Sequence, residues 1–169
     1  MPVYADSTSL IALGELRLLT VLQHLSTPIV ITPTIQLEVR NSAAQVSEAI
    51  SSGWLVVESP DAEATEKLLI ASRLDEGEAS LIAVAERLSG INADILIDEG
   101  RAFRYLRQKG MTNTFCLAQA LHRLEDDEHV SSCKEIMEEL AANHHYGWAK
   151  PVKAHYLQWC RATGYIPVV

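Results

Sequence analysis

The 169-residue sequence lacks the features that would place it in several common protein classes. Its three cysteines, Cys116, Cys133 and Cys160, are odd in number and far apart. No C-x-x-C or paired Cys/His spacing indicates a zinc site or a secreted disulfide scaffold, so we expect a reducing cytoplasm as its home. The G-x-S-x-G, G-x-x-x-x-G-K-[ST] and G-x-G-x-x-G motifs are also missing. Nothing therefore indicates an α/β-hydrolase, a P-loop NTPase or a dinucleotide-binding enzyme.

Long apolar runs and an excess of positive charge are missing as well. The apolar stretches break well before the roughly 20 residues that a bilayer requires, and no basic region marks a signal peptide, so we expect no membrane partner. Lys and Arg number 14 against 22 Asp and Glu, and 14 − 22 gives a net charge of −8. This charge opposes non-specific attraction to phosphate, so a nucleic acid partner would have to be held locally.

The composition and the periodicity that are present predict an α/β fold. With 48% hydrophobic and 21% charged residues, the chain is typical of one globular domain, which at this length needs no disulfide or structural metal. Short β-rich runs alternate with stretches of helical period up to about residue 110, a pattern that favours βαβ units and a parallel sheet. The expected strands are residues 2–5, 29–32, 54–58 and 93–97.

Helix signals follow these strands and continue to the end of the chain. Thr32-Pro33 is typical of an N-cap followed by a first-turn proline, and predicts a helix through Glu38 toward Asn41. Further helices are predicted over residues 42–52, 61–74, 77–88, 101–109, 115–124, 130–143 and 152–163. We therefore expect one domain, with a core of about residues 1–115 and a helical C-terminal extension of about residues 116–169.

Two aspartates follow apolar strands directly. Asp6 comes after Val3-Tyr4-Ala5, and Asp98 comes after Ile95-Leu96-Ile97. Parallel strands deliver such residues to the carboxyl edge of a sheet, where open α/β folds bind ligands. Taken one at a time, each aspartate is more simply explained as the N-cap of the following helix.

Two glutamates have no basic neighbour at helical spacing. Glu78 lies along the apolar stripe of its predicted helix, with no Lys or Arg three or four residues away. A buried unpaired carboxylate tends to neutralise or to find a cation, but a glutamate at a helix entry is equally consistent with this position. Glu38 also lacks a basic partner, and a solvated surface residue is its simplest interpretation alone.

The combination of these four acids favours a shared site. If Asp6, Glu38, Glu78 and Asp98 converge on one cleft, a bound cation would balance their mutual repulsion. Mg²⁺ or Mn²⁺ suits an oxygen-rich site of this kind, and such ions support hydrolysis of phosphodiesters by activating a water. The predicted metal ligands and catalytic residues are therefore these four side chains.

The same residues carry a family resemblance. Asp6-Ser7, Thr32-Pro33 leading to Leu37-Glu38-Val39, Gly77-Glu78-Ala79 and Leu96-Ile97-Asp98-Glu99 resemble, in order and spacing, the acidic motifs of PIN-domain ribonucleases, nearest to the VapC-like toxins. The resemblance covers about residues 2–115, with a looser similarity in the helical tail. It implies a three-layer α/β/α sandwich with a central parallel sheet, and metal-dependent cleavage of RNA.

Residue by residue, the resemblance assigns metal binding to Asp6, Glu38 and Asp98, and places Glu78 where Asp is commoner. Thr114 resembles a Ser/Thr hydroxyl often found near such sites, although Asn113 stands where Gly is common. Arg101 and Arg104 follow Asp98 and could contact substrate phosphates, although a solvated basic face explains them as well. The resemblance also implies a cytoplasmic toxin with an antitoxin partner, and leaves a homodimer or higher oligomer open.

Two other hypotheses fit the acids. The first is a non-catalytic PIN-like binding module that keeps them as a weak metal-binding or protein-binding patch. The second is a Rossmann-like phosphoryl-transfer domain with Asp6 as its aspartyl nucleophile. The second is weakened because Thr8 stands where the best-known enzymes of that type carry another aspartate.

Overall fold

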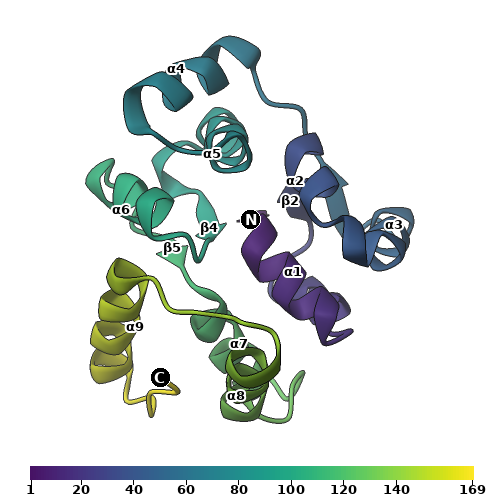
Figure 1. Ribbon diagram of the computed structural model, residues 1–169, viewed down its shortest axis with the longest axis vertical. Helices are drawn as coiled ribbons and strands as arrows, with labels where there is room; N and C mark the ends of the chain where they lie inside the picture. The colour runs from purple at the N-terminus through teal and green to yellow at the C-terminus, as the bar shows by residue number, and fades with distance from the viewer.

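A five-stranded, all-parallel sheet lies at the centre of the computed structural model, which describes residues 1–169 (Figure 1). The strand order is β3-β2-β1-β4-β5. The strands are β1 (Val3–Ala5), β2 (Ile29–Ile31), β3 (Leu55–Val57), β4 (Asp94–Leu96) and β5 (Thr114–Phe115). The four predicted strands are confirmed, each slightly shorter than expected.

Nine α-helices and three short 3₁₀-helices connect and cover the strands. The α-helices are α1 (Ser7–Glu15), α2 (Pro33–Glu38), α3 (Ala43–Ser51), α4 (Ala62–Ser72), α5 (Glu76–Ser89), α6 (Gly100–Gln108), α7 (Leu117–Asp126), α8 (Cys133–Asn143) and α9 (Lys150–Thr163). The 3₁₀-helices are η1 (Leu19–His24), η2 (Arg40–Ser42) and η3 (Gly90–Asn92). The predicted N-cap at Thr32 is confirmed, because its side chain accepts a hydrogen bond from the N–H of Ile35.

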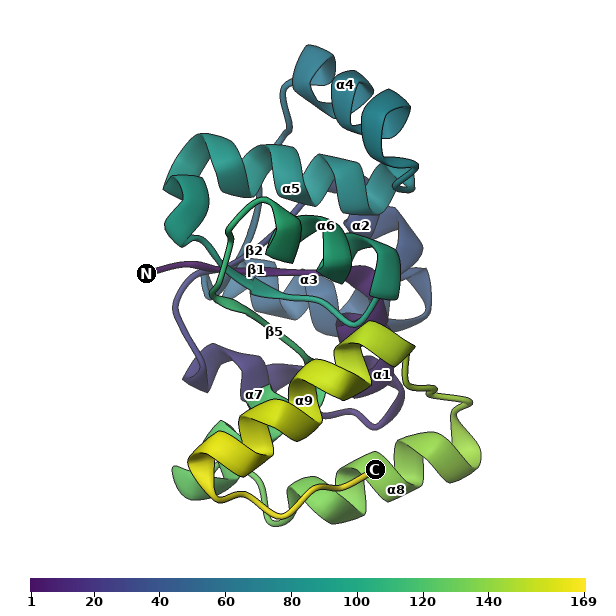
Figure 2. The same cartoon turned by 90° about the vertical axis from the view of Figure 1, so that its left-hand side faces the viewer.

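The helices lie on both sides of the sheet. Figure 1 shows α5 and α6 on one side, with α4 outside α5, and α1 and α7 on the other side. In Figure 2, α7, α8 and α9 gather at one end of the molecule, where α9 also contacts α6. The predicted α/β/α sandwich with a central parallel sheet is therefore confirmed.

Three parts of the chain differ from the sequence prediction. Strand β5 was not predicted, because it has only two residues and its apolar character continues into the next helix. Phe115 was expected at the start of a helix but belongs to β5, and α7 begins at Leu117. The helix α1 had no predicted bounds, since its mostly apolar sequence gives a weak amphipathic pattern.

The register of the two central strands determines where the site lies. Val3 pairs with Asp94 and Ala5 pairs with Leu96, so the residues just beyond β1 and β4 lie side by side. The N–H of Asp6 extends this pairing by donating to the carbonyl oxygen of Leu96 at 3.0 Å. Two chain segments far apart in sequence therefore end at the same sheet edge.

One hydrophobic cluster of 46 buried residues holds the sheet and helices together. It includes Leu121 of α7, Leu140 of α8 and Tyr156 of α9, so the C-terminal helices share the core of the sheet. Tyr156 stacks on Trp148 with ring centroids 4.9 Å apart, and this contact joins α9 to the segment before it. None of the helices combines the length and the apolar character that crossing a membrane would need.

Replacement of Tyr156 by Phe should destabilise the C-terminal helices. The Tyr156 hydroxyl lies 2.8 Å from Nε2 of buried His122 and accepts a hydrogen bond from the N–H of Val168. Leaving these groups unpaired should lower the free energy of unfolding by about 1–3 kcal/mol in urea denaturation. Tyr105→Phe is the control, because the Tyr105 hydroxyl makes no hydrogen bond within the chain; equal losses in both variants would contradict the assignment.

Candidate active site

Two aspartates meet at the carboxyl edge of the sheet. Asp6 and Asp98 are 4% and 5% exposed, so both carboxylates are almost fully removed from water. Oδ2 of Asp6 accepts a hydrogen bond from the N–H of Asp98 at 2.9 Å, and Oδ1 accepts one from the N–H of Ser9 at 3.0 Å. Asp6 is therefore both the N-cap of α1 and a direct contact of Asp98.

Three donors surround the Asp98 carboxylate. Ser9 Oγ donates to Oδ2 at 2.6 Å, and the Tyr146 hydroxyl donates to Oδ1 at 2.6 Å. The N–H of Leu117, in the first turn of α7, lies 3.2 Å from Oδ1 and 3.3 Å from Oδ2. Asp98 thus does not cap the helix that follows it, which begins after Glu99 with no side-chain cap.

Burial and mutual repulsion make both carboxylates difficult to ionise in the absence of a cation. Burial, followed by the charge of Asp98, raises the pKa of Asp6 to about 7. Burial also raises the pKa of Asp98, although the hydrogen bonds from Ser9, Tyr146 and Leu117 oppose this shift. No Lys, Arg or His side chain forms an ion pair with either residue. This pair of buried acids has no charge partner within the chain.

Glu78 has a role in building the helix that carries it. It is the third residue of α5. Oε2 of Glu78 accepts a hydrogen bond from the N–H of Asp75 at 2.9 Å, and the N–H of Glu78 donates to Oδ1 of Asp75 at 2.8 Å. This reciprocal capping box explains the acid at the helix entry. Glu78 is nevertheless only 8% exposed, and burial raises its pKa.

Neighbouring charges also act on Glu78. The hydrogen bond from the N–H of Asp75 lowers the pKa of Glu78, the negative charges of Asp75 and Glu99 raise it, and the positive charge of Arg101 lowers it. The structure therefore supplies a cation near Glu78 that helical spacing could not reveal, since Arg101 lies in α6. The hydrogen bond from Arg101 to the carbonyl oxygen of Arg73, which precedes α5, also brings the start of α6 near the start of α5.

Glu38, the last residue of α2, lies against the same helix entry. A Cβ atom added to Gly77 would lie 2.7 Å from Glu38 Oε1 and 3.0 Å from Oε2, so a glycine leaves room for this carboxylate. The first turn of α5 carries partial positive charge, which stabilises an acid at this place. Glu38 is exposed, in contrast to the other three predicted acids.

The four predicted acids thus form two pairs. Asp6 and Asp98 are in contact, and Glu38 and Glu78 both lie at the start of α5. No three His, Cys, Asp or Glu side chains are arranged so that they could hold one metal ion together. The chemistry of Asp6 and Asp98 still fits Mg²⁺ or Mn²⁺, because these ions prefer carboxylate oxygens and are often bound through only one or two of them plus water.

The other predicted residues differ in their positions. Arg101 donates to the carbonyl oxygen of Arg73 at 2.6 Å, and Arg104 is exposed on the same helix. Thr114 is buried and donates to the carbonyl oxygen of Met111 at 2.8 Å, with no hydrogen bond to any of the four acids. The hydroxyl groups that do contact Asp98 belong to Ser9 and Tyr146, neither of which was predicted.

Ser9 and Tyr146 differ in how far sequence analysis could find them. Ser9 stands three residues after the strand-end acid Asp6, on the same side of the first turn of α1, so helical spacing could have identified it. Tyr146 lies in the C-terminal extension and is brought to Asp98 only by the tertiary fold.

Two surface hollows are lined in part by residues of the acidic site or their neighbours. One of about 460 Å³ is lined by Thr34, Leu37, Glu38, Arg40 and Glu76. The other, of about 280 Å³, lies between α1 and the segment before α9 and includes Glu99 and Tyr146 in its lining. Of the four predicted acids, only Glu38 lines either hollow.

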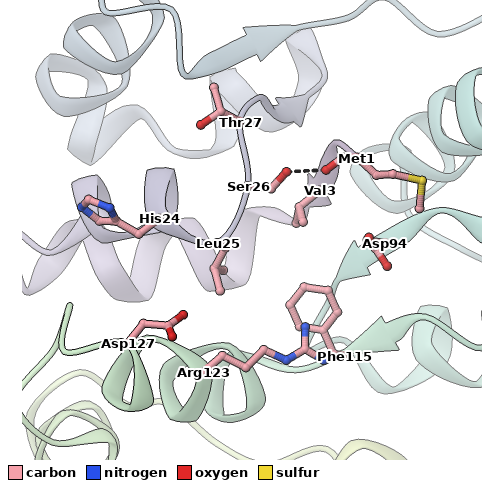
Figure 3. A pocket seen from close by; sticks show the side chains of 10 residues that line it. All are labelled: Met1, Val3, His24, Leu25, Ser26, Thr27, Asp94, Phe115, Arg123 and Asp127. Atoms are coloured by element: carbon pink, nitrogen blue, oxygen red, sulfur yellow. Dashed lines mark hydrogen bonds between the residues drawn. The ribbon is translucent and has the colours of Figure 1, made fainter.

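A further hollow lies at the opposite edge of the sheet. It has a volume of about 460 Å³, and Figure 3 shows its ten lining residues, among them Val3 and Asp94 at the starts of β1 and β4. Arg123 lies over the ring of Phe115 there, with 4.7 Å between its guanidinium carbon and the ring centroid. None of the predicted site residues lines this hollow.

A comparison with protein families identifies the chain. A family model described as a PIN domain matches residues 2–158. The chain belongs to the PIN-domain family. Neither the curated proteins nor the solved structures contain a match.

PIN domains are generally nucleases, and they typically use divalent metals. In this PIN domain the family match extends well beyond the predicted core and includes α7, α8 and most of α9. The C-terminal helices therefore belong to the matched region, and the contact between Tyr146 and Asp98 lies within it.

The stability of the metal-free PIN domain should fall as the pH rises. The pKa of Asp6 is about 7 in the fold against an ordinary value of 3.8, so the folded protein keeps a proton that the unfolded chain releases. The stabilisation of the fold by this proton is complete below about pH 4 and is lost as the pH rises through about 7. In EDTA, the melting temperature of Asp6→Asn should decline less steeply between pH 4 and 8. Equal slopes would contradict the assignment.

Proposed function

We propose that this PIN domain is a Mg²⁺- or Mn²⁺-dependent endoribonuclease that hydrolyses phosphodiester bonds in RNA. The observation that carries the proposal is the buried pair Asp6 and Asp98, which has no cation within the chain to balance its charge. Membership of a family whose members are generally metal-using nucleases supports the same reaction.

In this proposal Asp6 and Asp98 hold the metal directly. Glu38 and Glu78 lie at the start of α5 and would act through metal-bound water, since no three acids form a closed cluster. A bound divalent ion supplies an activated water and neutralises charge that develops on the phosphate. Ser9 and Tyr146 hold the Asp98 carboxylate in a fixed orientation for this task.

Positive side chains near the acids would position the RNA backbone. Arg40 lines the hollow that contains Glu38, and Arg101 and Arg104 extend along α6. Such residues contact phosphates without reading base sequence. They provide the local attraction that an otherwise acidic protein needs.

A non-catalytic binding module is the second candidate. The absence of a preformed group of three metal-binding side chains and the exposure of Glu38 favour it. In such a protein the acid pair would serve as a weak metal or protein contact. Cleavage of RNA, measured directly, separates the two candidates.

Asp6→Asn should reduce RNA cleavage in Mn²⁺ to the level that the wild-type protein shows in EDTA, because loss of a metal ligand removes the activated water. Asp94→Asn is the matched control, since Asp94 lies at the opposite end of β4 and lines the hollows at that edge. Gel analysis of labelled RNA measures the cleavage by each variant. Equal cleavage by wild-type protein in Mn²⁺, wild-type protein in EDTA and Asp6→Asn would refute the site.

Arg101→Ala should raise the KM for RNA several-fold and leave kcat less affected, because it removes a phosphate contact but no metal ligand. The control is Arg107→Ala at the other end of α6, where Arg107 donates to the carbonyl oxygen of Thr112. The dependence of KM on salt should also become weaker in Arg101→Ala. A loss confined to kcat would contradict this role.

We also propose that the enzyme is the toxin of a toxin–antitoxin pair, in the manner of VapC-like proteins. This part rests on the likeness of its acidic motifs to that group. Induced expression in a bacterial host should then arrest growth, Asp6→Asn should not, and the product of a small neighbouring reading frame should relieve the arrest. Normal growth with active wild-type protein would remove the toxin role and leave the ribonuclease proposal intact.

A further inference from the structure

The connection between α8 and α9, residues 144–149, contributes a side chain to the acidic site. Tyr146 in this connecting segment donates its hydroxyl to Asp98 Oδ1 at 2.6 Å. The Ser9 hydroxyl donates to the other carboxylate oxygen, Oδ2, also at 2.6 Å. The two short bonds therefore hold the carboxylate from opposite elements, α1 and the connecting segment.

The connecting segment is fixed to α1 and α8 at its start. Nδ1 of His144 lies 3.1 Å from Oε2 of Glu15, the last residue of α1. The N–H of Tyr146 donates to the carbonyl oxygen of Leu140 in α8 at 3.1 Å. His145 between them has a left-handed backbone, with φ of 54°, which turns the chain sharply before Tyr146. Figure 2 shows the segment passing beside α1 on its way to α9.

The same segment is fixed to α6 at its end. A Cβ atom added to Gly100 would lie 2.9 Å from Ala149 Cβ and 3.1 Å from Pro151 Cγ. The first turn of α6 and the end of the segment are therefore in close contact, just beyond Asp98 and Glu99. The segment is therefore attached at both ends and forms one wall of the site.

We infer that Tyr146 is a positioning residue that orients Asp98 for binding a divalent ion, so that the C-terminal extension completes the metal site. The inference rests on the proposed function. An ionised carboxylate has about four lone-pair positions, and three donors occupy part of them here. Donors behind a ligating carboxylate fix its orientation, and their removal typically reduces metal affinity or activity 10- to 100-fold.

The test measures Mn²⁺ binding without RNA, by the electron paramagnetic resonance signal of free Mn²⁺. Tyr146→Phe should bind Mn²⁺ about 10-fold more weakly than the wild-type protein. Tyr165→Phe is the matched control, because Tyr165 also donates to an aspartate, Asp126, in the C-terminal extension but far from the site. It should bind Mn²⁺ like the wild-type protein. Melting temperatures in EDTA show whether each variant is folded.

Each outcome decides a separate point. Weaker binding in Tyr146→Phe alone supports the positioning role, even if both Tyr variants lose the same stability. Unchanged binding overturns it and leaves the ribonuclease proposal standing. Tighter binding also overturns it, because Tyr146 would then compete with the ion for Asp98. If the wild-type protein binds no Mn²⁺, both the positioning role and the proposed function fail.

If Tyr146→Phe fails to fold, a second variant tests the role of the connecting segment. Gly100→Ala places a methyl group against Ala149 and Pro151 and should displace the connecting segment while keeping the Tyr146 hydroxyl. It should also weaken Mn²⁺ binding, whereas Gly147→Ala, which meets nothing within 4 Å, should leave it unchanged. Equal Mn²⁺ affinity in both glycine variants would overturn the proposed role of the segment.

Discussion

The repulsion between two buried carboxylates is the constraint on which the site depends. Asp6 and Asp98 are brought together because β1 and β4 are parallel neighbours that end at the same edge. Removal from water disfavours the charge of both residues, and hydrogen bonds from the backbone and from hydroxyl groups compensate only in part. A nearby divalent cation is the natural counter-charge for such a pair. The N–H of Asp98 keeps the two acids in contact, and donors from α1, from the start of α7 and from the segment between α8 and α9 hold the Asp98 carboxylate.

The layered fold could be predicted well from the sequence, because strand and helix periods alternate clearly over the first two thirds of the chain. Four of the five strands were found, and the parallel arrangement followed from that alternation. Strand β5 could not be predicted, because a strand of two residues is too short to show the alternation of apolar and polar residues. The start of α7 was misplaced for the same reason, since Phe115 pairs with Leu96 before the helix begins.

The site was predictable only in part. The strand-end position of Asp6 and Asp98 indicated their convergence, since it depends on topology alone. The reciprocal bond between Glu78 and Asp75 follows a local rule, whereas the influence of Arg101 on Glu78 depends on the packing of α6 near α5. Tyr146 lies outside any motif, and only the path of the C-terminal extension brings it to Asp98. A contact made by a residue outside the strand ends and helix termini, such as Tyr146, leaves no pattern in one sequence.

The close approach of Glu38 to Gly77 links two positions on different helices. Any larger residue at position 77 forces the Glu38 carboxylate away from the entry of α5, and the exposed glutamate side chain can make this move by rotation alone. A glycine at position 77 is therefore what allows the residue at position 38 to place its carboxylate against the first turn of α5. A homologue with alanine at position 77 and glutamate at position 38 would keep the path of α2 and turn the exposed glutamate side chain to another rotamer, away from the entry of α5.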